Sequence, residues 1–457
     1  MSAASFLRRL LGGARRRSHQ RTDHLADLCA SLLGGRGEVS GAALAREAIA
    51  AYGELDEPGR EAFFDLLAEE FAPSPEAVAR AADAYRDSPG PNTLLRLQEV
   101  VNSARQELFR RLNMAPGGTI TLVAMRQAIL RGLPKHPNWR AIDADLLHLF
   151  RSWFNRGFLR LERIDWRTSA MVLEKIIQYE AVHAIQGWRD LRRRLESDRR
   201  CFGFFHPQLP DEPIIFIEVA LTRGMSAQVQ PLLEMQAAVA SPDQADCAIF
   251  YSITNCQEGL RGISFGNLLI KHVAEELKRE FPQLKTFATL SPVPGFRRWL
   301  ARSDTQVQLA VGPDAEARLA LLKGIETAGW HLGEVPENLQ KLLMRLCAWY
   351  LMYAREGNDG DAEPLDPVAR FHLGNGAALE RINWLGDSSD AGMARSAGLM
   401  VNYVYRLEDV ERNHERYFAG HSVVASRAVE KLARKSPLAV PAATAASASP
   451  AKTDQEA

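Results

Sequence analysis

The sequence predicts two architectures in one chain: an all-helical N-terminal bundle, followed by a mixed α/β domain. Between residues 23 and 197 the apolar side chains recur at the spacing of amphipathic helices. After residue 198 the pattern changes to short runs rich in β-branched residues, which is typical of strands. A chain of 457 residues is too long for one ordinary core, so we expect residues 23–197 and 198–432 to form separate domains.

The helical region shows its periodicity most clearly in the segment EAFFDLLAEEF. Four apolar residues of this segment share one helical face: Phe63, Phe64, Leu67 and Phe71. Ser74 is suited to cap the next helix, and Pro75 fits its first position, where no N–H is needed. Helices should break at residues 87–92 and 114–118, and residues 158–166 read as a short extended piece. We find no catalytic group here and expect a scaffold or an oligomer interface.

The composition limits the classes of function. The chain is 46% apolar and 25% charged, and 56 basic residues balance 56 acidic ones, so no global field favours nucleic acid. No apolar run approaches the length that spans a bilayer. The cysteines are scattered and odd in number, which argues against a zinc site or disulfides and favours a reducing compartment. They are Cys29, Cys201, Cys247, Cys256 and Cys347.

The two ends differ from the rest. Residues 1–22 hold six arginines and no acid, which fits either a solvated basic arm or a mitochondrial transit peptide. We therefore expect a cytoplasmic protein, with the mitochondrial matrix as the alternative. Residues 433–457 form an Ala/Pro/Ser tract that should be disordered.

The α/β region contains recognisable strands and one informative turn. EPIIFIEVALT and CAIFYSIT read as strands, and the segment between them could be a helix interrupted by Pro231. Glu218, inside the first strand, is more simply a paired carboxylate than a functional one. The next stretch, RGISFGNLLIKHVAEELKREF, reads as a glycine-bearing turn that opens an amphipathic helix, and a further strand follows it.

That turn is a candidate phosphate site. Unpaired N–H groups and the positive end of the helix dipole favour an anion, and glycine lets a phosphate approach the backbone. The order R-x-x-S-x-G resembles the pyrophosphate-binding turn of GNAT-type acetyltransferases, whose pattern is Q/R-x-x-G-x-G/A. Ser264 replaces the first glycine of that pattern. A plain strand–turn–helix junction is the alternative. The candidate residues are Arg261, Gly262, Ile263, Ser264, Phe265, Gly266 and Asn267.

Two further segments carry possible chemistry. In FATLSPVPGF a strand is stopped at Ser291 by two nearby prolines, which places a hydroxyl on a stiff loop at a sheet end. In FHLGNGA, His372 precedes Asn375, which could orient a ligand carbonyl. Ser291 could instead be a turn cap, and His372 a structural histidine. If the two faced each other, they could share proton transfer.

Taken together, FATLSPVPGF, RGISFGNLLIK, FHLGNGA, RINWLGD and GLMVNYVY, in this order, resemble malonyl-CoA decarboxylases from about residue 80 to residue 430. The resemblance implies a lyase of fatty acid metabolism with a helical domain, a GNAT-like acyl-CoA-binding domain and a tendency to form homotetramers. It implies that Ser291 and His372 are catalytic and that the turn at residues 261–267 binds the acyl-CoA. Some relatives carry an acid where Ser264 stands, so that acid's role does not transfer.

The implied reaction needs no metal or organic cofactor, because the thioester of malonyl-CoA accepts the electrons of the broken bond as an enolate. We expect Ser291 to contact the departing carboxylate, His372 or Ser291 to deliver a proton, and Asn375 to orient the carboxylate. Two rival functions remain: an acyl-CoA-dependent acyltransferase and a non-catalytic CoA-binding scaffold. The first would need an acceptor groove, and the second would fit a chain lacking Ser291 or His372.

Overall fold

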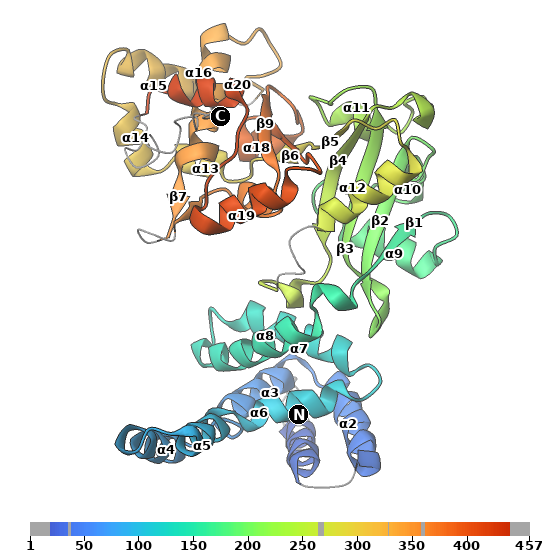
Figure 1. Cartoon of the computed structure of the whole chain (residues 1–457), viewed down its shortest axis with the longest axis vertical. Helices are drawn as coiled ribbons and strands as arrows, with labels where there is room; N and C mark the ends of the chain where they lie inside the picture. Colours follow the sequence, from blue (N-terminus) through green and yellow to red (C-terminus); the bar gives the residue numbers. More distant parts are fainter. Residues whose placement is uncertain (1–18, 35–37, 264–268, 328, 358–361, 439–457) are drawn as a thin grey trace, which may run out of the picture. The chain divides into compact units, whose positions relative to one another are not determined.

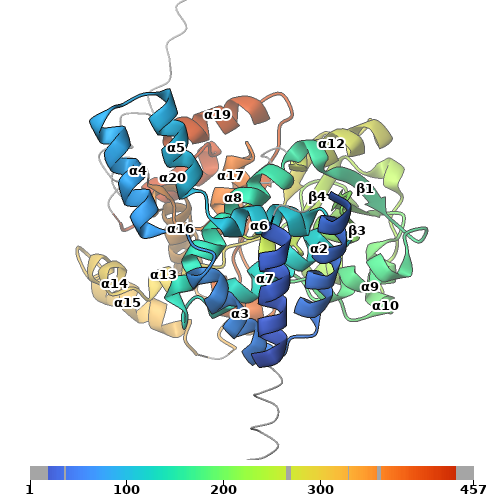
Figure 2. The same cartoon turned by 90° about the horizontal axis from the view of Figure 1, so that it is seen from below.

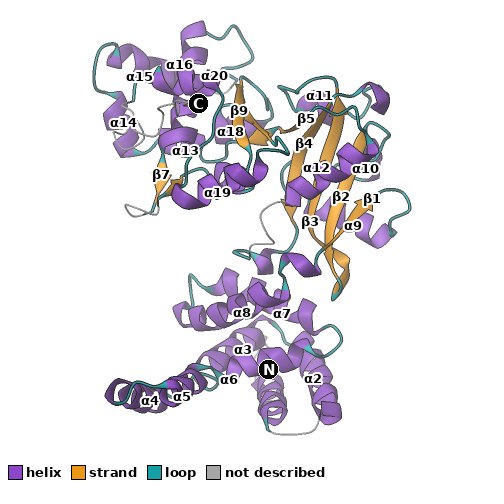
Figure 3. Ribbon diagram, viewed as in Figure 1, coloured by secondary structure: helices purple, strands orange, loops and turns teal. Residues whose placement is uncertain are grey.

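The computed structural model describes residues 19–34, 38–263, 269–327, 329–357 and 362–438. Contacts divide the chain into two compact units: residues 1–160, 204–214 and 255–265 form the first, and residues 161–203, 215–254 and 266–457 form the second (Figure 1). Helices make up nearly all of the N-terminal region, and the strands of the main sheet follow it in the chain (Figure 3). The predicted order of a helical region and then a mixed α/β region is confirmed.

The first unit is a set of helices whose apolar faces meet. They are a helix over residues 19–33, α2 (Glu38–Gly53), α3 (Glu57–Glu69), α4 (Pro75–Asp87), α5 (Pro91–Val101), α6 (Ala104–Asn113), α7 (Gly118–Gly132) and α8 (Arg140–Trp153). The predicted apolar face is confirmed, since Phe63, Phe64 and Leu67 are buried in α3 and Phe71 just after it. The predicted breaks are confirmed too, because they separate α4 from α5 and α6 from α7.

The helix α4 begins as the sequence predicts. The Ser74 hydroxyl accepts a hydrogen bond from the Ala77 N–H, and Pro75 occupies the first helical position. α4 and α5 lie side by side as a hairpin (Figure 2). None of the α5 residues is buried, so this hairpin presents most of its surface to solvent.

The main sheet has eight strands in the order β1-β2-β3-β4-β5-β10-β6, with β9 paired to β10. Its strands are β1 (Arg160–Ile164), β2 (Arg199–His206), β3 (Leu209–Thr222), β4 (Cys247–Asn255), β5 (Thr286–Thr289), β6 (Ser291–Pro292), β9 (Ala378–Asn383) and β10 (Met400–Val404). β1 confirms the extended piece that was predicted near residues 158–166. β3 and β4 confirm the two predicted strands.

A parallel pair forms the centre of this sheet. β4 and β5 run parallel, from Cys247 beside Thr286 to Phe250 beside Thr289, and helix α12 (Leu269–Glu280) connects them. Buried side chains of β4, β5 and β10, with Leu290 just after β5, pack in one apolar core: Cys247, Ile249, Tyr251, Ala288, Leu290, Met400 and Val404. The pairing of β4 with β5 ends where the Leu290 N–H donates to the Phe250 carbonyl. Beyond this point the chain pairs with β10 instead.

The segment between β3 and β4 differs from its prediction. Within residues 226–239, where a helix was predicted, only Gln230–Leu233 is helical (α11), with Pro231 in its first turn, so the predicted longer helix is wrong. Proline is tolerated in a first turn but not in a helix interior, which explains why the helix starts here rather than continuing through Pro231. Two more helices follow β1: α9 (Ala170–Tyr179) and α10 (Trp188–Arg194).

A large helical insertion separates β6 from β9. Its helices are α13 (Phe296–Leu300), α14 (Ser303–Leu309), α15 (Ala315–Gly324), α16 (Glu337–Tyr353) and α17 (Pro367–Gly374), with a short β7–β8 hairpin (Arg355–Glu356, Glu363–Pro364). The chain ends with α18 (Asp390–Ser396), α19 (Val410–Gly420) and α20 (Arg427–Arg434). Throughout the described part of the chain, no helix combines the length and apolarity that crossing a bilayer requires.

Candidate active site

Ser291 and His372 meet inside the second unit. Ser291 Oγ lies 2.9 Å from His372 Nε2, although 81 residues separate the two in sequence. Both side chains are buried, with exposed fractions of 5% and 3%. Shared proton transfer was expected only if the two residues faced each other; they do so here, and their catalytic role stays a prediction.

The sheet and the helical insertion each supply one member of the pair. Ser291 opens β6, where it lies opposite Val401 of β10. His372 lies in the last turn of α17, whose first turn is capped by the Asp366 carboxylate. The first proline of S-P-V-P-G can end a strand because it offers no N–H to a further neighbour. Ser291 is thus held at the point where the strand stops.

Hydrogen bonds extend from the pair in both directions. The Ser291 hydroxyl donates to Thr289 Oγ1 at 2.8 Å, and the Tyr405 hydroxyl lies 2.8 Å from His372 Nδ1. Because Ser291 donates to Thr289, its oxygen can accept from His372 Nε2–H, and a neutral ring protonated at Nε2 then accepts from Tyr405 at Nδ1. This arrangement satisfies both ring nitrogens and places the mobile proton on the nitrogen that faces Ser291.

Burial sets the charge state of the site. Desolvation lowers the pKa of His372 to about 3, so the imidazole of the free protein is neutral at neutral pH. Desolvation also raises the pKa of Tyr405 well above 10, so its hydroxyl keeps its proton. The ring of Tyr403 stacks on the imidazole, with centroids 4.7 Å apart and an interplanar angle of 27°, and fixes its plane.

Asn375 follows α17 and is buried. Its side-chain amide donates to the Phe371 carbonyl at 2.7 Å, and its own N–H bonds back to the same turn. The structure thus places Asn375 at the end of the helix that carries His372. A role in orienting the substrate stays a prediction.

The predicted acyl-CoA turn is described in part. Arg261, Gly262 and Ile263 follow a 3-10 turn (Glu258–Leu260), and Arg126 Nη1 donates to the Arg261 carbonyl at 2.8 Å. Gly262 has φ +81°, a left-handed conformation that favours glycine. These three residues belong to the first unit. The other members, Ser264, Phe265, Gly266 and Asn267, lie outside the described residues.

The glycine pair around Asn375 gives a prediction on stability. Gly376 has φ +82°, and a Cβ there would lie 2.1 Å from the Val410 carbonyl oxygen. We expect Gly376→Ala to lower the free energy of unfolding by about 2–5 kcal/mol, from backbone strain and overpacking together. Gly374→Ala is the matched control, because its Cβ would meet only the Tyr417 ring at 3.6 Å. Urea unfolding of both variants would contradict this account if the two lost equal stability.

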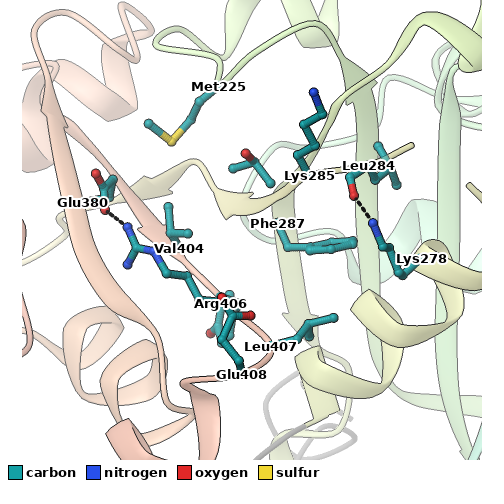
Figure 4. A pocket seen from close by; sticks show the side chains of 12 residues that line it. Met225, Lys278, Leu284, Lys285, Phe287, Glu380, Val404, Arg406, Leu407 and Glu408 are labelled. Carbon is teal, nitrogen blue, oxygen red and sulfur yellow. Dashed lines mark hydrogen bonds and ion pairs between the residues drawn. The ribbon is translucent and has the colours of Figure 1, made fainter. Parts of the chain in front are cut away.

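A pocket of about 390 Å³ lies in the second unit (Figure 4). Charged residues of both signs line it: Lys278, Lys285, Glu380, Arg406 and Glu408. Arg406 donates to Glu380 at 2.7 Å, and Lys278 to the Leu284 carbonyl at 2.6 Å. Tyr405 is also among the residues that line this pocket.

Three residues of the site escaped the sequence analysis. Thr289 was detectable, because residues two apart on a strand share a face and Thr289 precedes Ser291 by two. Tyr405 directly follows β10 and lies two residues after Tyr403, so it is related to Tyr403 as Ser291 is to Thr289. Asp366 precedes Pro367 in the same way that Ser74 precedes Pro75, which is the signature of a helix cap. In the described residues, no group of three or more His, Cys, Asp or Glu side chains could hold a metal ion.

Known proteins resemble this chain along most of its length. The profile of the malonyl-CoA decarboxylase C-terminal domain matches residues 157–443, and that of the N-terminal domain matches residues 71–154. A mitochondrial malonyl-CoA decarboxylase of Anser anser anser is 38% identical over 346 residues, covering 70% of this chain and 68% of that protein. The Mus musculus protein of the same name is 38% identical over 348 residues, covering 71% and 70%.

Solved structures agree with these sequence matches. The crystal structure of malonyl-CoA decarboxylase from Rhodopseudomonas palustris is 50% identical, with a TM-score of 0.84, and the match covers 90% of this chain and 99% of that one. The crystal structure of the Agrobacterium vitis protein of the same name is 46% identical with a TM-score of 0.81, over 90% and 99% of the two chains.

Proposed function

The chain belongs to the malonyl-CoA decarboxylase family, and from this premise we propose that Ser291 and His372 together handle the carboxylate and the proton as malonyl-CoA becomes acetyl-CoA and CO₂. The decarboxylation itself follows from the family. The assignment of the two residues rests on one observation: a buried hydroxyl and a buried imidazole lie 2.9 Å apart at the end of a central strand.

The chemistry demands little of the protein beyond orientation and one proton. The bond between the carboxylate carbon and the methylene carbon breaks, and its electron pair passes into the thioester as an enolate. CO₂ departs, and the methylene carbon takes one proton to give acetyl-CoA. We propose that no metal or organic cofactor takes part, because the thioester accepts the electron pair.

His372 Nε2 is the proposed proton donor. The imidazole of the free protein is neutral, but a malonyl carboxylate placed beside it favours the imidazolium and raises its pKa. When the carboxylate leaves as neutral CO₂, that support is lost and the proton moves to carbon. Ser291 Oγ, which faces Nε2, is placed to hydrogen-bond the carboxylate before it leaves.

Substrate binding is assigned to the remaining predicted residues. The turn at residues 261–267 is proposed to bind the CoA pyrophosphate, which the positive φ of Gly262 and the resemblance of the motif support. Asn375 is proposed to orient the malonyl carboxylate. Its place at the end of the His372 helix supports this role.

Tyr405→Phe tests the hydrogen-bond chain. Without the hydroxyl, His372 Nδ1 loses its 2.8 Å partner inside a dry site, and we expect the turnover number to fall by about 10-fold, the effect of one charge-assisted hydrogen bond. Tyr417→Phe is the matched control, because the buried Tyr417 hydroxyl has no hydrogen-bond partner within the described part of the chain. Steady-state kinetics with malonyl-CoA would contradict the assignment if both variants behaved alike.

The helical region is proposed to join copies of the chain into a dimer or tetramer. The α4–α5 hairpin supports this, because it exposes Leu94, Leu95 and Val101 by 40%, 58% and 51%. The variant Leu94→Glu/Leu95→Glu should lower the mass measured by light scattering. An unchanged mass would remove the hairpin from the interface.

We propose that the protein is cytoplasmic, with the mitochondrial matrix as the alternative compartment. The bacterial sources of the solved relatives support the first, and the name of the Anser and Mus relatives supports the second.

A further inference from the structure

Asp366 connects the two segments that carry the site. It precedes α17, the helix of His372, and its exposed fraction is 1%. One carboxylate oxygen, Oδ1, accepts hydrogen bonds from the Val368 and Ala369 N–H groups, both at 3.0 Å. The first turn of α17 is therefore tied to this side chain.

The same carboxylate also lies against the loop of Ser291. The backbone N–H of Gly295, in the sequence S-P-V-P-G, is close enough to the Asp366 carboxylate to lower its pKa. Tyr350 of α16 closes the arrangement, with its hydroxyl 3.4 Å from Asp366 Oδ2. A Cβ at residue 295 would lie 2.3 Å from the Tyr350 hydroxyl and 3.7 Å from Asp366 Oδ2, which explains the glycine.

The connection on each side is stiff. Two prolines, Pro292 and Pro294, lie between Ser291 and Gly295 and restrict the backbone of that loop. His372 lies six positions after Asp366, and the chain from Pro367 to His372 is part of the short helix α17. A shift of either segment where it meets the carboxylate would therefore displace Ser291 or His372 at the far end of that segment.

A helix cap by itself does not require this residue. Ser74 caps α4 with a hydroxyl ahead of a proline, as Asp366 caps α17. A buried carboxylate costs desolvation, and burial raises the pKa of Asp366 to about 6. The second carboxylate oxygen, Oδ2, lies 3.4 Å from the Tyr350 hydroxyl and next to Gly295, which a capping serine would not reach.

We propose that Asp366 is a positioning residue, whose carboxylate holds the Ser291 loop and the His372 helix at their mutual distance. The inference rests on the proposed function, since it gives Asp366 a role only through Ser291 and His372. Asp366 does not touch substrate in this account.

The variant Asp366→Ser separates the two duties of the carboxylate. A serine keeps the cap of α17, as Ser74 does for α4, but is too short to keep the contact with Gly295. We expect kcat for malonyl-CoA to fall by about 10–10²-fold with little change in KM. The side chains of Ser291 and His372 are displaced, while the turn proposed to bind CoA is unchanged. The matched control is Asp56→Ser, which changes the aspartate cap of α3 in the first unit and should leave kcat unaltered.

A second variant tests the same inference if the Asp366→Ser protein does not fold. Asp366→Asn is isosteric, and its single amide oxygen cannot serve both the α17 cap and the Gly295 N–H, so kcat should fall here too. Combining either variant with Ser291→Ala and His372→Ala should cost no further activity, because Asp366 acts through those residues.

The outcomes are distinct. A folded Asp366→Ser or Asp366→Asn protein with wild-type kcat would overturn the inference, as would a further loss that multiplies that of the Ser291→Ala/His372→Ala protein. Failure of the proposed function would appear elsewhere, as undiminished turnover in the Ser291→Ala and His372→Ala proteins themselves.

Discussion

The His372→Ala variant is expected to lower the turnover number for malonyl-CoA by about 10²–10⁴-fold, the range for a positioned acid–base group. The imidazole is buried, its plane is fixed by Tyr403, and its Nε2–H faces Ser291. Removing it takes away the proposed proton donor and leaves Ser291 without its partner at 2.9 Å. Acetyl-CoA formation under saturating substrate gives this number directly.

A histidine outside the site provides the control for that measurement. His136 belongs to the first unit, where its ring stacks on Trp139 with centroids 4.0 Å apart. His136→Ala should keep wild-type turnover. A His372→Ala protein that folds, binds CoA and still turns over malonyl-CoA at near the wild-type rate would exclude His372 as the proton donor.

The Ser291→Ala variant is expected to lose a comparable factor, about 10²–10⁴-fold in kcat. Its hydroxyl joins Thr289 Oγ1 at 2.8 Å to His372 Nε2 at 2.9 Å, so the change removes both the contact to the carboxylate and the orientation of the imidazole. The pH at which His372 titrates in the complex should shift as well, since its hydrogen-bond partner is gone.

Ser396→Ala is the matched control for Ser291→Ala. Ser396 is also a buried serine of the second unit, but its hydroxyl donates only to the backbone carbonyls of Gly392 and Leu399. It should cost stability rather than turnover. Equal loss of kcat in the two serine variants would mean that any buried serine of this unit matters, and Ser291 would lose its special role.

The parts of the fold that local patterns determine were predictable. The buried face of α3, the cap of α4 and the strands β3 and β4 all follow from periodicity and turn chemistry. Glu218 is paired as expected, since Arg194 Nη1 donates to it at 2.8 Å. The error at residues 226–239 lies on either side of α11: a helical pattern met Pro231, and only the tertiary structure decides how much of the helix forms.

The site was predictable only through the resemblance. No spacing rule joins Ser291 to His372, because the intervening helices α13–α16 were not predicted and they determine where α17 lies. Two neighbouring residues of the site could be predicted from local patterns, since Thr289 shares the strand face of Ser291 and Asp366 carries the signature of a helix cap. That the Asp366 carboxylate also lies against Gly295 depends on tertiary packing and could not be read from either segment.

The most direct test of the central claim is a double-mutant cycle on Ser291 and His372, measured as acetyl-CoA and CO₂ release from malonyl-CoA in a buffer that contains a metal chelator. The wild-type protein should release both products in equal amounts despite the chelator. Residues that act as a unit are non-additive, so Ser291→Ala/His372→Ala should be no slower than the slower single variant. Losses that multiply, or a wild-type protein that stops when metal is removed, would contradict a cofactor-free Ser–His pair.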